Sequence, residues 1–347
     1  MYLIHSNECE GVMTSYNDIM SCYKFILGRD ANAEEINAIS ENLLDISDIP
    51  FGEHRRMFLS SDEFHHRHAE VIFGNFVRKS IEVLYETKQK FKIYLDLRQY
   101  HMTFGIFSGQ YEKFDIDIIK AVTPDNGVFF DVGGNVGYYS LSVASKPNFS
   151  GKVVAFEPLP HLWNLFNKSI SENKLSKTVK VHKLALADAP GIMELNTAEH
   201  TVNAGATSLI AGSGNTTSER STKVETLDRI AKGLKPDSIK VDIEGAEELF
   251  FAGAAETITA SKPTMLVEVN REVLATLSKT TPGRIFDRLS GWGYEVWEVL
   301  EDTIRQLPTG PATDTAFPAG RVANILAVHS DRRQDVAHRL KALDLTL

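Results

Sequence analysis

Hydrophobic positions in the first 97 residues recur at the three- and four-residue spacing of an amphipathic helix. Ile36, Ile39 and Leu43 form such a stripe, and the segment 71–97 repeats the pattern over a longer stretch. Residues that recur in this way lie on one side of a helix and can be buried together. We therefore predict that residues 1–97 form a helical accessory domain.

From about residue 104 the pattern changes to short apolar runs that alternate with helical stretches. Alternation at ~25-residue spacing is typical of βαβ units, in which neighbouring strands run parallel. Residues 98–347 are therefore predicted to form one α/β domain around a mostly parallel sheet. The predicted strands are 128–132, 153–156, 179–184, 239–243, 265–269, 294–299 and 323–329, and the predicted helices are 138–145, 161–173 and 246–260.

The composition is that of an ordinary globular protein. Of 347 residues, 43% are hydrophobic and 24% are charged, which excludes a largely disordered or fibrous chain. The formal net charge is -9, whereas a protein that binds nucleic acid needs a basic face to displace phosphate counterions. Nucleic acid is therefore not expected as a partner.

The cysteines and the first residues indicate where the protein works. Cys9 and Cys22 are the two cysteines, which favours a reducing compartment, although a bridge or metal site between them stays open. The first ten residues lack the basic and apolar regions of a secretory signal. No segment approaches the ~18 uninterrupted apolar residues of a membrane span. We expect a cytoplasmic protein without such a span.

The strongest chemical signal is a glycine-rich turn after the first strand of the predicted sheet. Asp131 is followed by Gly133, Gly134 and Gly137, with Asn135 between them, and a helical segment begins at once. Glycines let the backbone approach a ligand closely, and the helix N-terminus presents unbonded N–H groups. The turn therefore suits a nucleotide-like cofactor at the carboxyl edge of the sheet.

The choice of cofactor depends on two acids. A dinucleotide fingerprint has the pattern G-x-G-x-x-G, whereas the glycines here follow G-G-x-x-G. Asp131 would repel a pyrophosphate but suits S-adenosylmethionine (SAM), which carries ammonium and sulfonium groups and no phosphate. Glu157, before Pro158, ends the next strand, where a carboxylate can accept both ribose hydroxyls. SAM is favoured; NAD, and a plain turn with incidental acids, are the alternatives.

The motifs along residues 104–329 resemble those of the FkbM-family methyltransferases, in the same order and at the same spacing. One departure is Gly134, which stands where the family more often has alanine. The matching segments are SGQYE at 108–112, the glycine turn with two tyrosines at 131–139, VVAFEP at 153–158, ALAD at 185–188, IKVDIEGAE at 239–247, KPTMLVEVN at 262–270 and GYEVWEV at 293–299.

The resemblance implies a Rossmann-like class I methyltransferase fold with a seven-stranded, mostly parallel sheet. It also implies SAM as cofactor and S-adenosylhomocysteine (SAH) as product. The glycine turn would hold the methionine end, Glu157 the ribose, and Asp188 would lie near the adenine. The predicted cofactor-binding residues are Asp131, Gly133, Gly134, Asn135, Gly137, Glu157, Pro158, Asp188, Tyr111 and Glu112.

Three acids near predicted strand ends are candidates for catalysis. Methyl transfer is an in-line displacement, so alignment supplies much of the acceleration, and an alcohol nucleophile also needs a base. The resemblance implies that Asp242 faces the methyl group. We predict Asp242 as the base or substrate-orienting group, with Glu268 as the second candidate and Glu244 as the third. Capping or loop hydrogen bonds remain an alternative role for Glu244 and Glu268. We expect no metal, although the three acids could gather Mg²⁺.

These observations predict a SAM-dependent O-methyltransferase acting on a hydroxyl of a sugar, glycan or polyketide-like metabolite. The glycan preference rests on the N-terminal segments LGR at 27–29 and FLSSDEF at 58–64, which resemble modules found beside glycosyltransferases and surface-polysaccharide enzymes. Docking, homo-oligomerisation and acceptor presentation are candidate roles of that region. The alternatives are a SAM- or SAH-binding module without turnover and an NAD-linked oxidoreductase.

Overall fold

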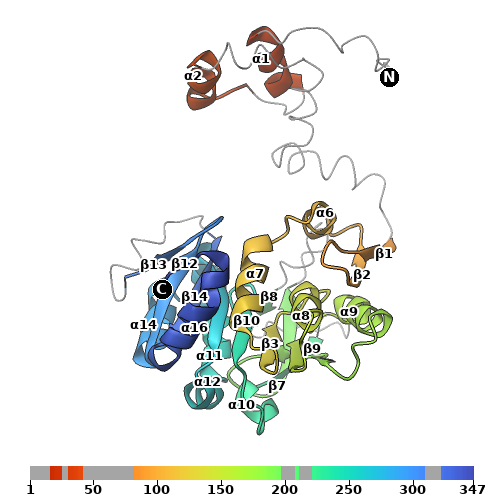
Figure 1. Cartoon of the computed structure of the whole chain (residues 1–347), viewed down its shortest axis with the longest axis vertical. Coiled ribbons are helices and arrows are strands. Elements are labelled where there is room, and N and C mark those ends of the chain that lie inside the picture. Colours follow the sequence, from red (N-terminus) through yellow and green to blue (C-terminus); the bar gives the residue numbers. More distant parts are fainter. Residues whose placement is uncertain (1–15, 26–29, 42–80, 197–207, 211–220, 309–321) are drawn as a thin grey trace. The chain divides into compact units, whose positions relative to one another are not determined.

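The computed structural model describes residues 16–25, 30–41, 81–196, 208–210, 221–308 and 322–347. Two compact units divide the chain, Met1–Ser80 and Ile81–Leu347 (Figure 1). None of the helices among these residues has the length and hydropathy needed to cross a membrane.

The first unit contains two described helices, α1 (Tyr16–Phe25) and α2 (Ala33–Glu41). A reciprocal pair of hydrogen bonds caps α2: Asn32 Oδ1 accepts from the Glu35 N–H at 2.9 Å, and Glu35 Oε2 accepts from the Asn32 N–H at 2.7 Å. The helical prediction is confirmed for these two segments. The LGR and FLSSDEF segments lie outside the described residues, and the role of this unit stays a prediction.

The second unit begins with a hairpin, β1 (Glu82–Glu86) and β2 (Lys92–Asp96), so the helical prediction for 71–97 is wrong over these residues. Phe91, Ile93 and Leu95 are buried at every second position, which is the period of a strand and not of a helix. Leu84, which contributed to the expected helical stripe, is 44% exposed. The hairpin belongs to the second unit, which therefore begins at Ile81 and not at residue 98.

The hairpin docks on a helix that follows the second strand of the main sheet, α9 (Pro160–Glu172). Ser169 Oγ accepts from the Tyr94 N–H at 2.9 Å, and Asn173 Oδ1 accepts from the Lys92 N–H at 2.8 Å. The outer edge of β2 is thus bonded to side chains of the helix region, which removes unpaired backbone groups from that edge.

The main sheet has eight strands in the order β13-β12-β14-β11-β10-β3-β4-β5. The strands β5, β4, β3, β10 and β11 run parallel, and β14 is antiparallel to both β11 and β12. Their bounds are β3 (Val128–Val132), β4 (Lys152–Phe156), β5 (Val179–His182), β10 (Ser238–Val241), β11 (Thr264–Asn270), β12 (Tyr294–Val299), β13 (Ile304–Gln306) and β14 (Val322–His329).

This topology is the class I methyltransferase fold that the sequence predicts. Each of the seven predicted strands is present, and a hairpin adds the short edge strand β13 as an eighth. A smaller sheet with the order β6-β9-β7-β8 lies apart from it in hydrogen bonding. Its strands are β6 (Ala185–Leu186), β7 (Gly191–Asn196), β8 (Ser208–Ile210) and β9 (Ser221–Glu225).

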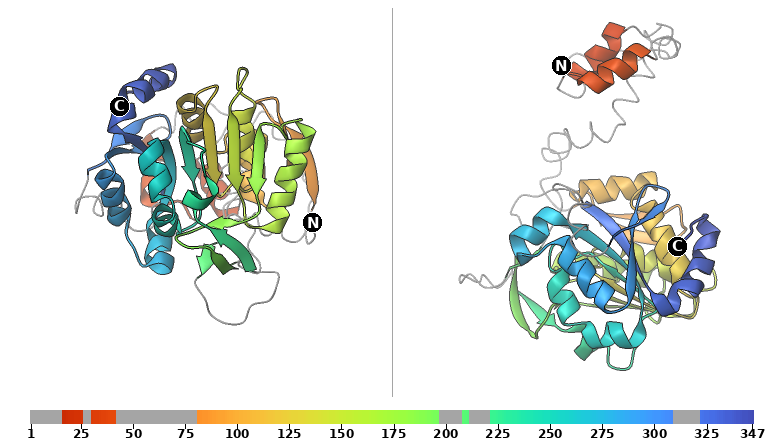
Figure 2. Two further views of the ribbon diagram at one scale, coloured as in Figure 1. Left: turned by 90° about the horizontal axis from the view of Figure 1, so that it is seen from below. Right: turned by 90° about the vertical axis from the view of Figure 1, so that its left-hand side faces the viewer.

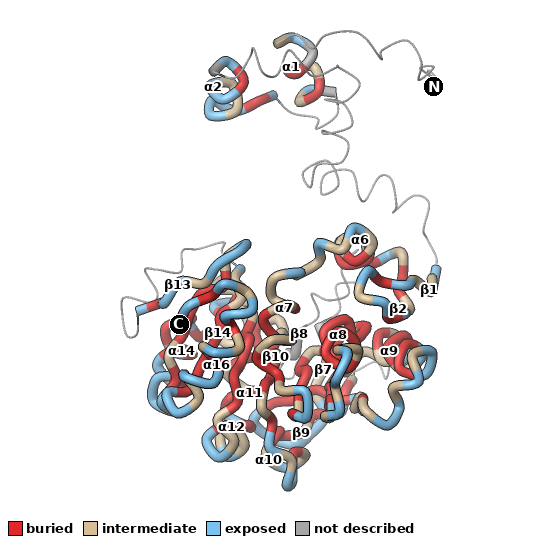
Figure 3. Tube along the Cα trace, viewed as in Figure 1, coloured by how far each residue is buried: buried red, intermediate tan, exposed pale blue. Residues whose placement is uncertain are grey.

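Helices cover both faces of the main sheet and give three layers (Figure 2). Phe129 and Phe130, which are successive residues of β3, belong to different hydrophobic clusters, because successive strand residues point to opposite faces. The strands form the buried centre (Figure 3). One face carries α6 (Tyr100–Ser108), α7 (Lys113–Val122), α8 (Tyr138–Ala144), α9 and α16 (Arg333–Leu340); the other carries α10 (Leu227–Ile230), α11 (Glu247–Ala252), α12 (Ala255–Ser261) and α14 (Pro282–Gly291).

The parallel strands bring the predicted site residues to one edge of the sheet. In the chain, β3, β4 and β10 are each followed directly by one or more of these residues. Parallel strands that pair in register end at the same edge, and ligands of open α/β sheets bind there. The candidate site is therefore built at the carboxyl ends of β3, β4, β10 and β11.

Candidate functional site

The turn after β3 requires glycine at two positions. Gly133 has φ +83°, and a Cβ there would lie 1.8 Å from the Asp242 carbonyl oxygen. Gly137 has φ +90°, and a Cβ there would lie 2.2 Å from the Phe166 ring. Both positions thus combine a left-handed backbone with close packing. At Gly134 the backbone is ordinary, which fits a position where alanine is common in the family.

Two acceptor oxygens at this turn are buried and have no hydrogen-bond partner among the described residues: Asp131 Oδ1 and Asn135 Oδ1. The other oxygen of Asp131 accepts from Ser140, from Oγ at 2.6 Å and from the backbone N–H at 3.2 Å. Buried polar atoms normally have partners. The turn therefore presents acceptors for a ligand that donates hydrogen bonds.

Glu157 links the end of β4 to the same turn. Its Oε2 accepts from the Asn135 N–H at 2.8 Å, and its Oε1 accepts from the Leu159 N–H at 2.7 Å. Burial raises the pKa of Glu157 to about 8, against the opposing effect of these two backbone bonds. Pro158 follows at the start of the loop and is partly buried. A carboxylate has further lone pairs, so Glu157 can still accept from hydroxyl groups.

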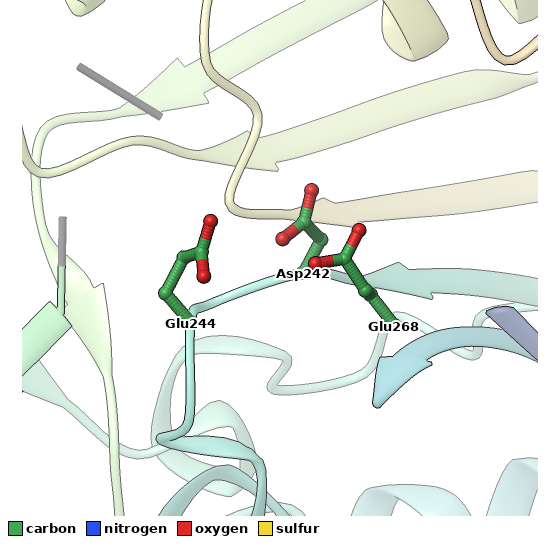
Figure 4. A group of neighbouring side chains, drawn as sticks. All are labelled: Asp242, Glu244 and Glu268. Carbon is green, nitrogen blue, oxygen red and sulfur yellow. The ribbon is translucent and has the colours of Figure 1, made fainter. Parts of the chain in front are cut away.

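The three predicted catalytic acids lie together beyond β10 and on β11 (Figure 4). Asp242, Glu244 and Glu268 are partly buried, and one carboxyl oxygen of each lies within 4.8 Å of the others. The charge of Asp242, followed by burial, raises the pKa of Glu268 well above its usual range. Burial, followed by the charge of Asp242, raises the pKa of Glu244 to about 7. The cluster therefore favours the protonated form of Glu268.

The sequence interpretation missed Lys240, which lies on β10 beside these acids. The residue is 5% exposed, and its Nζ lies 2.8 Å from Asp242 Oδ2. The same ammonium group lies 4.8 Å from the centre of the Tyr139 ring, a cation–π distance. Nearby carboxylates raise the pKa of Lys240 despite its burial. A charged residue inside an apolar strand run was the available signal, because buried lysines are almost always paired.

The predicted residues of the SGQYE segment face the same cluster. Burial raises the pKa of Tyr111 well above its usual value, and the charges of Glu112, Asp242 and Glu268 add to this effect. Burial raises the pKa of Glu112 too, with Lys240 opposing and Asp242 adding to the effect. Glu112 precedes α7 with a left-handed backbone, φ 42°. The segment 108–112 is thus brought to the acids of the strand ends.

Two further residues of the site have the left-handed backbone that non-glycine residues rarely adopt. The φ angles are 49° at Asn135 and 51° at Glu244. Each conformation costs of order 1–3 kcal/mol, and such strain is concentrated at functional sites. The strained residues follow β3 and β10, so both strand ends carry it.

Asp188 is the predicted site residue that belongs to the region of the smaller sheet. It is exposed and follows β6 of the smaller sheet. Its Cα would lie 3.2 Å from a Cβ added at Gly253, so its backbone packs against the loop after α11. Its expected position near the adenine stays a prediction.

The arrangement can hold a cationic ligand with hydroxyl groups. Asp131 Oδ1 and Asn135 Oδ1 offer acceptors at the glycine turn, and Glu157 offers a carboxylate one strand away. These acceptors fit the hydrogen-bond donors of SAM, which are its ammonium group and its ribose hydroxyls. Oxygen ligands from three acids also suit a divalent cation, but the ammonium group of Lys240 already engages Asp242.

Comparisons with known proteins bear on the class of activity. The sequence profile described as "Methyltransferase FkbM domain" matches residues 131–296, which include all the site residues except Tyr111 and Glu112. A search of the curated proteins finds no match.

Solved structures similar to this chain include those of two methyltransferases and of TYW2 in complex with AdoMet. The FkbM methyltransferase of Methylobacillus flagellatus is 13% identical, with a TM-score of 0.37, over 64% of this chain and 53% of that chain. The chain thus spans about half the length of that protein. Precorrin-6y C5,15-methyltransferase of Geobacter metallireducens is 12% identical, with a TM-score of 0.35, over 63% and 88%. TYW2 of M. jannaschii is 14% identical, with a TM-score of 0.39, over 72% and 85%.

The profile match covers the glycine turn, Glu157, Lys240 and the three clustered acids, and the sheet around them has the order expected of a methyltransferase. The motifs that carry the resemblance in the sequence lie within or directly beside the matched residues. The second unit of this chain therefore carries an FkbM methyltransferase domain over residues 131–296.

Proposed function

We propose that this protein transfers a methyl group from SAM to a hydroxyl oxygen of a sugar, glycan or polyketide-like acceptor. The observation that carries the cofactor assignment is the pair of unpartnered buried acceptors, Asp131 Oδ1 and Asn135 Oδ1. An ammonium group has three donors and no acceptor. It would satisfy both oxygens and would also compensate the buried charge of Asp131.

The other cofactor contacts follow from the same edge of the sheet. Glu157 accepts the ribose hydroxyls, and its existing bonds to the Asn135 and Leu159 N–H groups hold its carboxylate in position. Gly133 and Gly137 keep the turn free of side chains. Tyr111 and Glu112 close the site from the loop before α7, and Asp188 contributes near the adenine.

When bound, SAM supplies an electrophilic methyl group on a sulfonium sulfur. The chain's own residues then align the acceptor oxygen and remove its proton. Asp242 is the proposed base, because Lys240 holds Oδ2 at 2.8 Å and leaves Oδ1 for the acceptor hydroxyl. Transfer of that methyl group would form a carbon–oxygen bond, break the carbon–sulfur bond and release SAH, and the acceptor proton would move to Asp242 Oδ1. A positioned base of this kind contributes roughly 10²–10⁴-fold.

Glu268 is the second carboxyl near the acceptor. Its raised pKa favours the protonated form, which makes Glu268 a hydrogen-bond donor that can orient the acceptor oxygen. Glu244 contributes the third carboxyl group beside the acceptor, because one of its oxygens lies within 4.8 Å of oxygens of Asp242 and Glu268. The proposed class of acceptor rests on the resemblance of the N-terminal segments to modules found beside polysaccharide enzymes and on analogy with the family. That argument is weaker than the one from the cofactor contacts.

Calorimetry with SAM, SAH and NAD tests the cofactor assignment. We expect saturable binding of SAM and SAH, its loss in Asp131→Ala, and no binding of NAD. Circular dichroism of Asp131→Ala establishes that the variant is folded. Binding of NAD, or of none of the three, would overturn the proposal.

A second experiment tests the acceptor. Labelled methyl transfer is measured to saccharides, to polyketide-like alcohols and to transfer RNA. Product formation with the first two classes is expected. Transfer to RNA alone would contradict both the O-methylation of small acceptors and the expectation from the net charge.

A further inference from the structure

Lys240 occupies an unusual position for a charged residue. It lies in the interior strand β10, directly opposite Asp131 of β3 in the parallel register. In-register residues of parallel neighbours point to the same face, so both side chains lie on the side covered by α7 and α8. Its Nζ lies 2.8 Å from Asp242 Oδ2 and 4.8 Å from the centre of the Tyr139 ring. Two contacts, one to the loop after β10 and one to α8, therefore fix this ammonium group.

Lys240 is the shared counter-charge of the site. Its charge lowers the pKa of six carboxyl groups, against the burial that raises them: Glu112, Asp115, Asp131, Glu157, Glu244 and Glu268. Within the residues that the structure describes, no other basic side chain is among the main influences on these six. Asp242 is in direct contact with it.

We propose that Lys240 is a positioning residue that fixes the Asp242 carboxylate and takes the place of a divalent cation among Asp242, Glu244 and Glu268. Three carboxyl groups with oxygens within 4.8 Å of one another repel each other when they are ionised, and a positive charge or a bound proton relieves that repulsion. Mg²⁺ or Ca²⁺ can supply such a positive charge to carboxylate oxygens. Here a buried ammonium group already bonds to Asp242 Oδ2, and it repels a second cation at the same oxygens.

The consequence for the reaction is that acceptor activation needs no metal. Lys240 engages Oδ2 of Asp242, so Oδ1 is the oxygen presented to the acceptor. This step rests on the proposed function, because it assigns Asp242 a role toward a hydroxyl acceptor. The substitution of an ammonium group for a metal ion does not depend on the proposed reaction, and its test requires no cofactor.

Electron paramagnetic resonance of Mn²⁺ tests the inference, because it separates bound from unbound ion. Wild type and Lys240→Arg are expected to bind no Mn²⁺ more tightly than about 1 mM, the weak end of the range for oxygen-ligand sites. Lys240→Met removes the charge and keeps an unbranched side chain. We expect it to bind one Mn²⁺ at least about tenfold more tightly, because the repulsion is gone.

Two further variants locate the effect. Adding Glu268→Gln to Lys240→Met should abolish the gained Mn²⁺ binding, which assigns the ion to this cluster. Lys146→Met is the matched control, because Lys146 is also largely buried and ion-paired, with Asp125 at 3.0 Å, but away from the site. It should gain no Mn²⁺ binding.

The outcomes that would overturn the inference are equally definite. Tight Mn²⁺ binding by wild type that Glu268→Gln abolishes would mean that the acids form a metal site beside Lys240. No gain in a folded Lys240→Met would mean that the ammonium group does not exclude a cation. If Lys240→Met does not fold, Lys240→Gln replaces it with the same expectation. Failure of wild type to bind SAH would overturn the proposed function and leave these Mn²⁺ results unaffected.

Discussion

Ser140 holds the buried carboxylate of Asp131 through two donors, its hydroxyl at 2.6 Å and its backbone N–H at 3.2 Å, both to Oδ2. Because Ser140 lies in the first turn of α8, the helix that follows the glycine turn also fixes the acid that precedes it. Oδ1 of Asp131 is left without a partner among the described residues. The proposed cofactor contact is thus pre-oriented by the fold.

Replacing Ser140 with alanine should weaken SAH binding. The lost bond to a charged acceptor is worth about 1.5–3 kcal/mol, shared between binding and folding, so we expect the dissociation constant to rise about three- to tenfold and the unfolding free energy to fall by about 1 kcal/mol. Ser142→Ala is the matched control, because Ser142 is buried on the same helix and its hydroxyl has no partner among the described residues. Calorimetry and urea unfolding measure both variants, and an equal effect of the two would contradict the role of Ser140.

The glycine turn makes a prediction about stability. Gly137→Ala places a Cβ at φ +90° and 2.2 Å from the Phe166 ring, so we expect a loss of at least about 2–3 kcal/mol of unfolding free energy. Gly134→Ala has an ordinary backbone and a contact of 3.1 Å to Phe166, so it should cost less than about 1.5 kcal/mol. Urea unfolding compares them. Equal destabilisation would mean that the conformation of Gly137 is not the limiting feature.

The chemistry at the strand ends was predictable because the relevant residues adjoin their strands in the sequence. Asp131, Glu157 and Asp242 each lie at or just after a predicted strand, and a parallel sheet brings such ends to one edge. The class of fold could be predicted for the same reason. Neither inference requires knowledge of contacts between distant side chains.

The parts that could not be predicted depend on which way a side chain points. A helical stripe that includes Leu84 and Tyr85 predicts a helix where the hairpin β1–β2 lies, whereas Leu84 is exposed. Lys240 lies within a short apolar run of the sequence, and its side-chain contacts come from α8 and from the loop after β10. Asp188 lies beyond the main sheet, which no local pattern around ALAD indicates.

Glu247 makes the stability of the protein depend on pH. Burial raises the pKa of Glu247 to about 7 from an ordinary 4.5, so the folded state holds a proton that the unfolded state has lost. The stability from this group is present below about pH 4.5 and is lost as the pH rises toward about 7. The protein should therefore unfold more easily at pH 8 than at pH 5.

Glu247→Gln tests this pH dependence. The amide can keep the bond that Oε1 accepts from the Gly245 N–H at 3.1 Å, and it removes the charge. We expect the variant to match wild type at pH 5 and to exceed it by roughly 1–3 kcal/mol at pH 8. Urea unfolding at both pH values measures the difference. A variant that is less stable than wild type by the same amount at both pH values would contradict the raised pKa.

Asp242 and Asp131 should separate into two roles, one in turnover and one in cofactor binding. Asp242→Asn keeps the size of the side chain and removes the charge that Lys240 holds at 2.8 Å, so it removes the proposed base without emptying the glycine turn. We expect turnover to fall roughly 10²–10⁴-fold, with SAH affinity within about threefold of wild type. Asp131→Ala should instead abolish measurable SAH binding, because a buried carboxylate with an unpartnered oxygen is lost. Labelled methyl transfer and calorimetry measure the two quantities on the same preparations. Equal loss of SAH affinity in both variants would show that Asp242 acts on the cofactor and not on the acceptor.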